Sequence, residues 1–175
     1  MGEAVDHRER RSKALTGGSF EAFFADQYEV LLRAMYLATG DRYEAEDLTQ
    51  EAFVKAYERW DRVRAMGNPI GYVYRIAMNG HRKRVRRVVL GARRALANRP
   101  SDPISETDDR DLLRRALATL PAGQREAIVL VEWLGMSSEE AAPILGISPV
   151  AVRVRVSRAK QALRFVNERA EGAMS

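Results

Sequence analysis

Apolar side chains recur at spacings of three and four residues along most of this 175-residue chain, and this period restricts the chain to helices. The pattern is clearest after Ser19, where one stripe consists of Phe20, Phe23, Phe24, Tyr28, Leu31, Leu32, Met35 and Tyr36. No strand-like alternation and no internal repeat competes with it. The sequence therefore predicts an all-α fold made of two small helical domains joined by a flexible linker.

Capping residues indicate where these helices begin and end. Ser19 and Asp41 are suited to be N-caps, Gly40 ends the first helix, and Asn68 followed by Pro69 is a strong helix start. Between residues 91 and 109 the periodicity fades and turn-forming residues accumulate, which is typical of a linker. We predict a flexible tail (1–18), a first domain (19–90), a linker (91–108) and a second domain that contains a helix-turn-helix (109–170).

Positive charge is concentrated in two segments that contain no acidic residue. The net charge is +5 and the isoelectric point is about 9.8, which alone is a weak indication of a polyanionic partner. One acid-free segment lies between Asp61 and Asp102, and the other between Glu140 and Glu168. A single basic run is often only a solvated face. Two such runs favour nucleic acid, because each neutralised phosphate releases counterions.

Several classes of protein are excluded or disfavoured by composition. The chain has no cysteine, and its two histidines, His7 and His81, are far apart, so we expect neither a metal site nor a cofactor. The N-terminus has no apolar signal region and no segment is long enough to insert into a membrane, so we expect a cytoplasmic protein. The sequence contains neither paired carboxylates with a nucleophile nor a phosphate-binding loop, so nothing in it supports an enzymatic function.

The segment from about residue 138 to residue 164 has the features of a helix-turn-helix. Ser137 or Ser138 can cap a first helix, Gly146 can close it in a left-handed conformation, and Ser148 with Pro149 starts the second. Small residues, Ala141 and Ala142, let the two helices cross closely. Pro143 fits poorly, because it removes a helical hydrogen bond and can kink the first helix.

The second helix of this motif has one apolar and one polar face. A wheel of 3.6 residues per turn predicts a buried stripe of Val152, Val156, Ala159 and Leu163. The opposite face presents Val150, Val154, Ser157 and Arg158, with Arg153 on one flank and Arg155 on the other. In the major groove a central face touches base edges and flanking cations touch phosphates. A helical hairpin whose arginines are merely solvated is the alternative.

Four segments in order resemble the extracytoplasmic-function group of the sigma-70 family of bacterial RNA polymerase sigma factors. They are Ala45-Glu-Asp-Leu-Thr-Gln-Glu-Ala-Phe53, Pro69-Ile-Gly-Tyr-Val-Tyr-Arg-Ile-Ala-Met-Asn79, Leu120-Pro-Ala-Gly-Gln-Arg-Glu-Ala127 and the helix-turn-helix. The resemblance covers about residues 19–168. It implies a protein that binds core RNA polymerase through its clamp and flap surfaces, recognises promoter DNA, helps to melt it, and has an anti-sigma factor as a partner.

The resemblance also implies roles for particular residues. Asp47, Gln50 and Glu51 correspond to the surface that binds the polymerase clamp. Tyr72, Tyr74, Asn79, Arg82, Lys83 and Arg86 lie in the segment that opens and reads the minus-ten element. Unstacked bases need aromatic surfaces and their backbone needs cations, although one of the two tyrosines is expected in the core. The minus-thirty-five reader comprises Val150, Arg153, Val154, Arg155, Ser157 and Arg158.

Two departures from the family pattern affect the minus-ten segment. Many relatives carry a tryptophan near Tyr72 and an acidic residue shortly after Asn79, whereas here Gly80 follows Asn79. Gly80 puts in doubt the register of this helix and the bases that it reads. A stand-alone helix-turn-helix regulator that acts as a dimer is the alternative function, but it leaves the acidic face around Asp47 unexplained.

Overall fold

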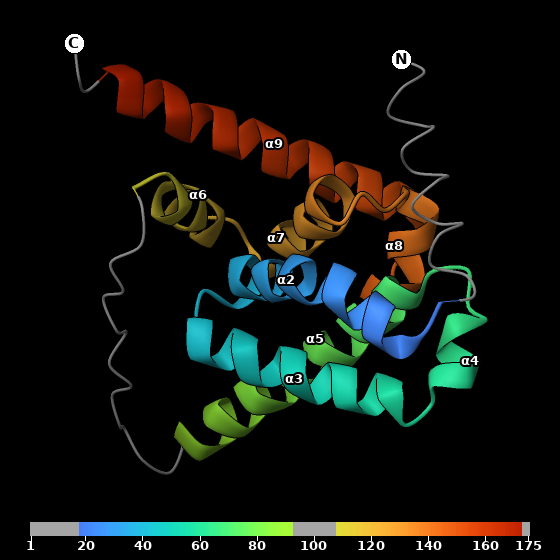
Figure 1. Cartoon of the computed structure of the whole chain (residues 1–175). Helices are drawn as coiled ribbons and strands as arrows, with labels where there is room; N and C mark the ends of the chain where they lie inside the picture. The colour runs from blue at the N-terminus through green and yellow to red at the C-terminus, as the bar shows by residue number, and fades with distance from the viewer. Residues whose placement is uncertain (1–17, 93–107, 173–175) are drawn as a thin grey trace. The chain divides into compact units, whose positions relative to one another are not determined.

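The computed structural model describes residues 18–92 and 108–172, and within them the chain forms helices and no strand (Figure 1). The chain divides into two compact units, residues 1–102 and 103–175. The first contains α2 (Phe20–Thr39), α3 (Arg42–Tyr57), α4 (Trp60–Arg64) and α5 (Pro69–Ala92). The second contains α6 (Asp108–Ala118), α7 (Ala122–Ile128), the π-helical turn η1 (Val129–Trp133), α8 (Ser138–Leu145) and α9 (Pro149–Gly172). The predicted all-α fold is confirmed.

Residues with strong capping preferences begin α2, α3 and α5 of the first unit, as predicted. Ser19 Oγ accepts a hydrogen bond from the Ala22 amide at 3.3 Å, and Asp41 Oδ1 accepts one from the Glu44 amide at 2.9 Å. Asn68 Oδ1 accepts from the Gly71 amide at 2.9 Å, immediately before Pro69 opens α5. Gly40 ends α2 with a left-handed φ of 77°, which allows α3 to turn back against α2.

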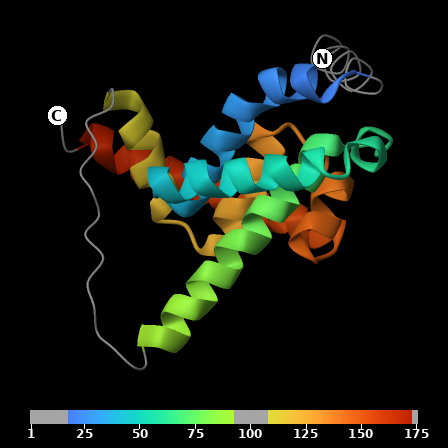
Figure 2. The ribbon, with the colours of Figure 1, turned by 60° about the horizontal axis from the view of Figure 1, so that its bottom comes forward.

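The core of the first unit lies where α3 packs between α2 and α5. Its largest fully buried side chains include Leu31 and Met35 from α2, Phe53 from α3, and Tyr74 and Met78 from α5. At one end, aromatic rings from α2, α3 and α4 form a cluster with centroids 4.9–6.4 Å apart: Phe20, Phe23, Phe24, Tyr28, Phe53, Tyr57 and Trp60. The second half of α5 extends beyond α3 (Figure 2).

Gly80 lies where α5 packs against Leu48 of α3. A Cβ added at Gly80 would lie 2.7 Å from Leu48 Cδ2, inside van der Waals contact, and Leu48 is itself buried. α5 nevertheless continues without a break through this position. Gly80 therefore allows the two helices to pack closely. Its presence does not interrupt α5, so the doubt about the register of this helix does not apply.

In the second unit the helix-turn-helix forms as predicted. Ser137 and Glu140 make a capping box at the start of α8, with hydrogen bonds of 3.1 and 2.7 Å between each side chain and the other residue's amide. Gly146 closes α8 with a φ of 68°, and Ser148 Oγ accepts from the Ala151 amide at 3.2 Å to start α9. Pro143 lies within α8, which continues past it to Leu145.

Some features were not predicted, and some predictions lie outside the described residues. The short helix α4 and the π-helical turn η1 were missed, and α5 runs to Ala92, beyond the predicted start of the linker. The predicted tail and most of the predicted linker fall outside the described residues. Among the helices that the structure describes, none combines the length and apolar character that a membrane span requires.

Candidate DNA and protein interfaces

The outer face of α9 is exposed along the predicted reading surface. Val150 is 60% exposed and Val154 is 43% exposed, although both are apolar. Ser157 and Arg158 are exposed on the same face, while Val152 and Ala159 on the opposite face are fully buried. Val156 and Leu163, also predicted to be buried, are half-buried, so the predicted orientation of α9 is confirmed although only part of the stripe is fully buried.

Carboxylates on neighbouring elements hold two cations of α9. Arg153 Nη1 donates to Glu139 Oε1 of α8 at 3.0 Å, and Lys160 Nζ lies 2.8 Å from Glu132 Oε1 of η1. All four side chains are about half exposed, and ion pairs in such positions contribute little stability. Arg153 can therefore leave Glu139 for a phosphate or a base at little cost.

Arg155 was predicted as a cation flanking the reading face, and the structure places its guanidinium elsewhere. A Cβ added at Gly123 of α7 would lie 2.9 Å from Arg155 Nη1, so the guanidinium lies directly against this glycine. Arg155 is half-buried as a result. Because Gly123 has no side chain, the long side chain of Arg155 can pack there. Arg155 thus forms a contact between α9 and α7, and its predicted flanking contact with DNA stays a prediction.

The two tyrosines at the start of α5 differ in exposure. Tyr74 is 0% exposed, so its ring cannot stack on a base, and its predicted part in reading the minus-ten element is wrong. Tyr72 is half-buried, and the guanidinium carbon of Arg75 lies 5.5 Å from the centre of its ring. Tyr72 is therefore the tyrosine of this pair that can offer a stacking surface next to a cation.

The remaining predicted minus-ten residues lie further along α5, from its third to its fifth turn. Asn79, Lys83 and Arg86 are exposed, and Arg82 is half-buried. Between α5 and α3 runs a groove of about 420 Å³, lined by Glu51, Lys55, Ile76, Asn79, Gly80, Lys83, Arg84 and Arg87. Two of the predicted residues, Asn79 and Lys83, therefore share a groove with cations that were not predicted.

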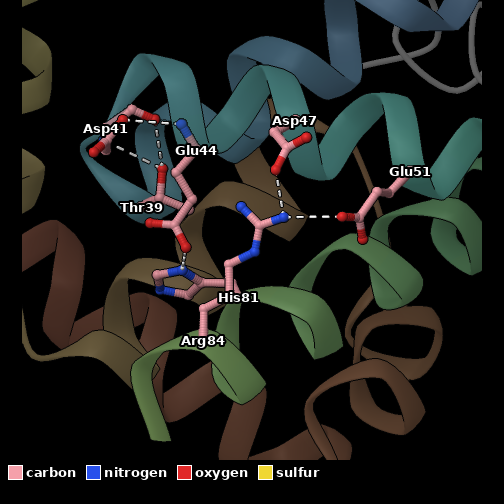
Figure 3. Close-up of polar contacts among 7 residues, drawn as sticks. All are labelled: Thr39, Asp41, Glu44, Asp47, Glu51, His81 and Arg84. Carbon is pink, nitrogen blue, oxygen red and sulfur yellow. Dashed lines mark hydrogen bonds and ion pairs between the residues drawn. The ribbon is translucent and has the colours of Figure 1, made fainter. Parts of the chain in front are cut away.

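The three predicted polymerase-binding residues, Asp47, Gln50 and Glu51, are all exposed on α3. Two of them also contact α5. Arg84 Nη2 donates to Asp47 Oδ2 and, at 2.9 Å, to Glu51 Oε1 (Figure 3). Arg84 was not predicted as a site residue, because a contact over 33 to 37 positions leaves no trace in local sequence patterns.

A second polar contact joins the same two helices one turn away. His81 Nδ1 lies 3.1 Å from Glu44 Oε1 (Figure 3). Both His81 and Arg84 of α5 therefore contact carboxylates of α3. Partial burial would by itself lower the pKa of Arg84, but the hydrogen bond to Asp47 and the nearby carboxylate charges raise it. Arg84 is therefore charged whenever the protein is folded.

Comparisons with known proteins agree on one family. Residues 24–89 match the family described as Sigma-70 region 2, and residues 110–163 match Sigma-70, region 4. The chain is 32% identical over 148 residues to the RNA polymerase sigma-E factor of Streptomyces coelicolor, covering 83% of this chain and 84% of that protein. It is 32% identical over 154 residues to the ECF RNA polymerase sigma factor SigC of Mycobacterium tuberculosis, covering 84% and 82%.

Solved structures give the same result. The fold is similar to that of the sigma factor RpoE in complex with the anti-sigma factor NepR from Bartonella quintana, with a TM-score of 0.68 and 28% identity over 85% of this chain and 98% of that one. It is also similar to CnrH in complex with the cytosolic domain of CnrY, with a TM-score of 0.63 and 25% identity over 90% and 94%. These matches favour the polymerase subunit over the stand-alone regulator.

Proposed function

Because the chain belongs to the extracytoplasmic-function group of the sigma-70 family, we propose that its two units divide promoter recognition between them. The first unit docks on core RNA polymerase through α3 and captures the melted minus-ten strand on α5. The second unit reads the minus-thirty-five duplex with α9. As a subunit of RNA polymerase the protein acts in the cytoplasm and contributes binding rather than a chemical step of its own.

Reading by α9 is supported by the exposed face of Val150, Val154, Ser157 and Arg158. Two exposed valines lie on this face beside Ser157 and Arg158, so the face offers both apolar and polar groups to base edges. Arg158 can pair bidentately with guanine, and Val154 can contact a thymine methyl group. Arg153, once released from Glu139, adds a contact to a base or a phosphate.

Docking by α3 is supported by the exposure of Asp47, Gln50 and Glu51 on one side of the helix. Two further exposed apolar residues, Val54 and Tyr57, follow one and two turns later on this helix. Charged and polar groups beside exposed apolar side chains are the composition of a protein–protein interface. The polymerase clamp is the partner that the family resemblance assigns to this surface.

An anti-sigma factor is a further proposed partner. Both solved relatives are described in complexes with such a protein, RpoE with NepR and CnrH with CnrY. The boundaries at residues 18, 90 and 108 are also proposals. The linker between the two units would let polymerase hold them at the spacing of the two promoter elements, and let an inhibitor hold them in another arrangement.

Binding of the full chain to purified core polymerase tests the docking proposal. Gln50→Ala removes a side chain of the proposed interface without breaking the ion pairs of Arg84, and we expect it to weaken core binding about tenfold, the effect of a single interface residue worth about 1.4 kcal/mol. Asp26→Asn, at an exposed position of α2 outside the proposed surface, is the control and should leave the affinity unchanged. Equal affinity of all three proteins would rule out this face of α3 as the docking surface.

A further inference from the structure

Arg84 lies where the proposed docking surface meets the DNA-binding helix. One of its terminal nitrogens donates to both Asp47 and Glu51, while the side chain remains 31% exposed (Figure 3). Arginine binds phosphate and carboxylate with the same planar set of donors. The two carboxylates therefore occupy donors that would otherwise be available to a phosphate.

The surroundings of Arg84 suit a phosphate group. Arg84 lines the groove between α3 and α5 together with three further cations, Lys55, Lys83 and Arg87, and with the amide of Asn79. Gly80 also lines the groove and contributes no side chain to it. The one acidic residue that lines it is Glu51, the same residue that binds Arg84 and lies 3.7 Å from Lys55 Nζ.

We propose that this groove binds a backbone phosphate of single-stranded DNA through Arg84, and that Asp47 and Glu51 mask the site until polymerase engages them. This proposal rests on the docking role of these two carboxylates proposed above. In the free protein the charge of Arg84 is neutralised internally. In the holoenzyme the partner takes over the carboxylates, and Arg84 turns to the DNA strand that α5 captures.

The exchange is energetically easy because of where the groups lie. Asp47 and Glu51 are 57% and 47% exposed, and ion pairs between exposed groups are weak enough for another partner to replace them. The neighbouring contact of His81 with Glu44 involves different residues and keeps α5 against α3 while Arg84 changes partner. Since coupling between two binding events is reciprocal, DNA in the groove would also strengthen polymerase docking.

The test measures binding of a fluorescein-labelled oligothymidylate to the full chain, without polymerase, as a function of salt concentration. Asp47→Asn with Glu51→Gln should unmask Arg84, raise the affinity severalfold and steepen the salt dependence by about 0.7 in log–log slope, the value for one added single-strand phosphate. Asp26→Asn with Glu58→Gln changes the net charge by the same amount at exposed positions outside the groove and is the matched control.

Adding Arg84→Gln identifies the cation that is unmasked. In the Asp47→Asn, Glu51→Gln protein it should abolish the gain in affinity and in slope, whereas in the wild-type protein it should change the affinity little. The helical circular dichroism signal of each variant reports whether it is folded. A gain no larger than that of the control pair, or a gain that survives the loss of Arg84, would overturn the proposal. Because polymerase is absent, this result is independent of the docking experiment.

Discussion

Gly80 is a residue at which helix propensity and packing have opposite effects. Inside a helix, glycine is less favourable than alanine by about 1 kcal/mol. Here, however, the methyl group of alanine would collide with the buried Leu48 side chain at 2.7 Å. Overpacking a well-filled core costs about 1–3 kcal/mol, so the collision should outweigh the gain in helix propensity.

We therefore predict that Gly80→Ala lowers the free energy of unfolding of the first unit by about 1 kcal/mol, the difference between these two effects. Trp60 fluorescence in a Trp133→Phe background reports on this unit, because the chain has two tryptophans and one lies in each unit. In a Leu48→Ala background the collision is removed, and the same substitution should become neutral or stabilising. Destabilisation of equal size in both backgrounds would show that packing against Leu48 is not the cause.

Capping residues were the most reliable guide from the sequence to the structure. Ser19, Asp41, Asn68, Gly40 and Gly146 each stand where the sequence placed them, because a cap is a local interaction within a few residues. Contacts between distant residues could not be predicted. The burial of Tyr74, the packing of Arg155 on Gly123 and the pairing of Arg84 all depend on how helices meet.

At the scale of elements, α4 and η1 were missed for different reasons. α4 is five residues long, and within it only Val63 is buried, so it has too few apolar positions to show a helical period. η1 is continuous with α7 and widens the helix by one residue, with the Leu134 amide donating to the Val129 carbonyl at 3.0 Å. Periodicity predicts one helix across both, because η1 ends this helix and no further turn follows in which a shifted pattern could be seen.

The capping box of α8 is an element whose contribution can be measured. Ser137→Ala should lower the free energy of unfolding of the second unit by about 1 kcal/mol, because the Glu140 amide loses its acceptor. The measurement is urea unfolding followed by Trp133 fluorescence in a Trp60→Phe background. Ser138→Ala changes the neighbouring serine, which does not cap the helix, and should stay within about 0.5 kcal/mol of the parent. A larger effect at Ser138 than at Ser137 would show that Ser137 is not the residue that caps α8.

Two arginines of α9 differ in their surroundings: Arg158 is exposed, whereas Arg155 packs against Gly123 of α7. We predict that Arg158→Ala weakens binding to minus-thirty-five duplex DNA by about 1–3 kcal/mol and alters the preferred base at one position. Arg155→Ala should leave base preference unchanged, because its guanidinium lies against Gly123. Competition binding with duplexes that differ by single base pairs provides the measurement. A change in base preference on losing Arg155 would contradict the assignment of Arg158 as the base-reading arginine.

At the scale of the whole molecule, the proposed surfaces for polymerase docking and DNA recognition lie on different helices of two units. The sequence predicted this division because each unit carries its own motifs and its own acid-free basic segment. It missed the direct contact through which α3 and α5 share Arg84. The proposed docking and strand-capture surfaces are thus physically connected within the first unit, while the proposed duplex reader, α9, belongs to the second.

Transcription in vitro on a library of random promoter sequences, followed by sequencing of the transcripts, tests the central claim most directly. With core polymerase and this protein, we expect start sites that share two conserved upstream blocks at a fixed spacing. Arg158→Ala should alter the upstream block and leave the downstream one unchanged. If the protein adds no start sites to those of core polymerase alone, it does not direct promoter recognition, and the proposed function is wrong.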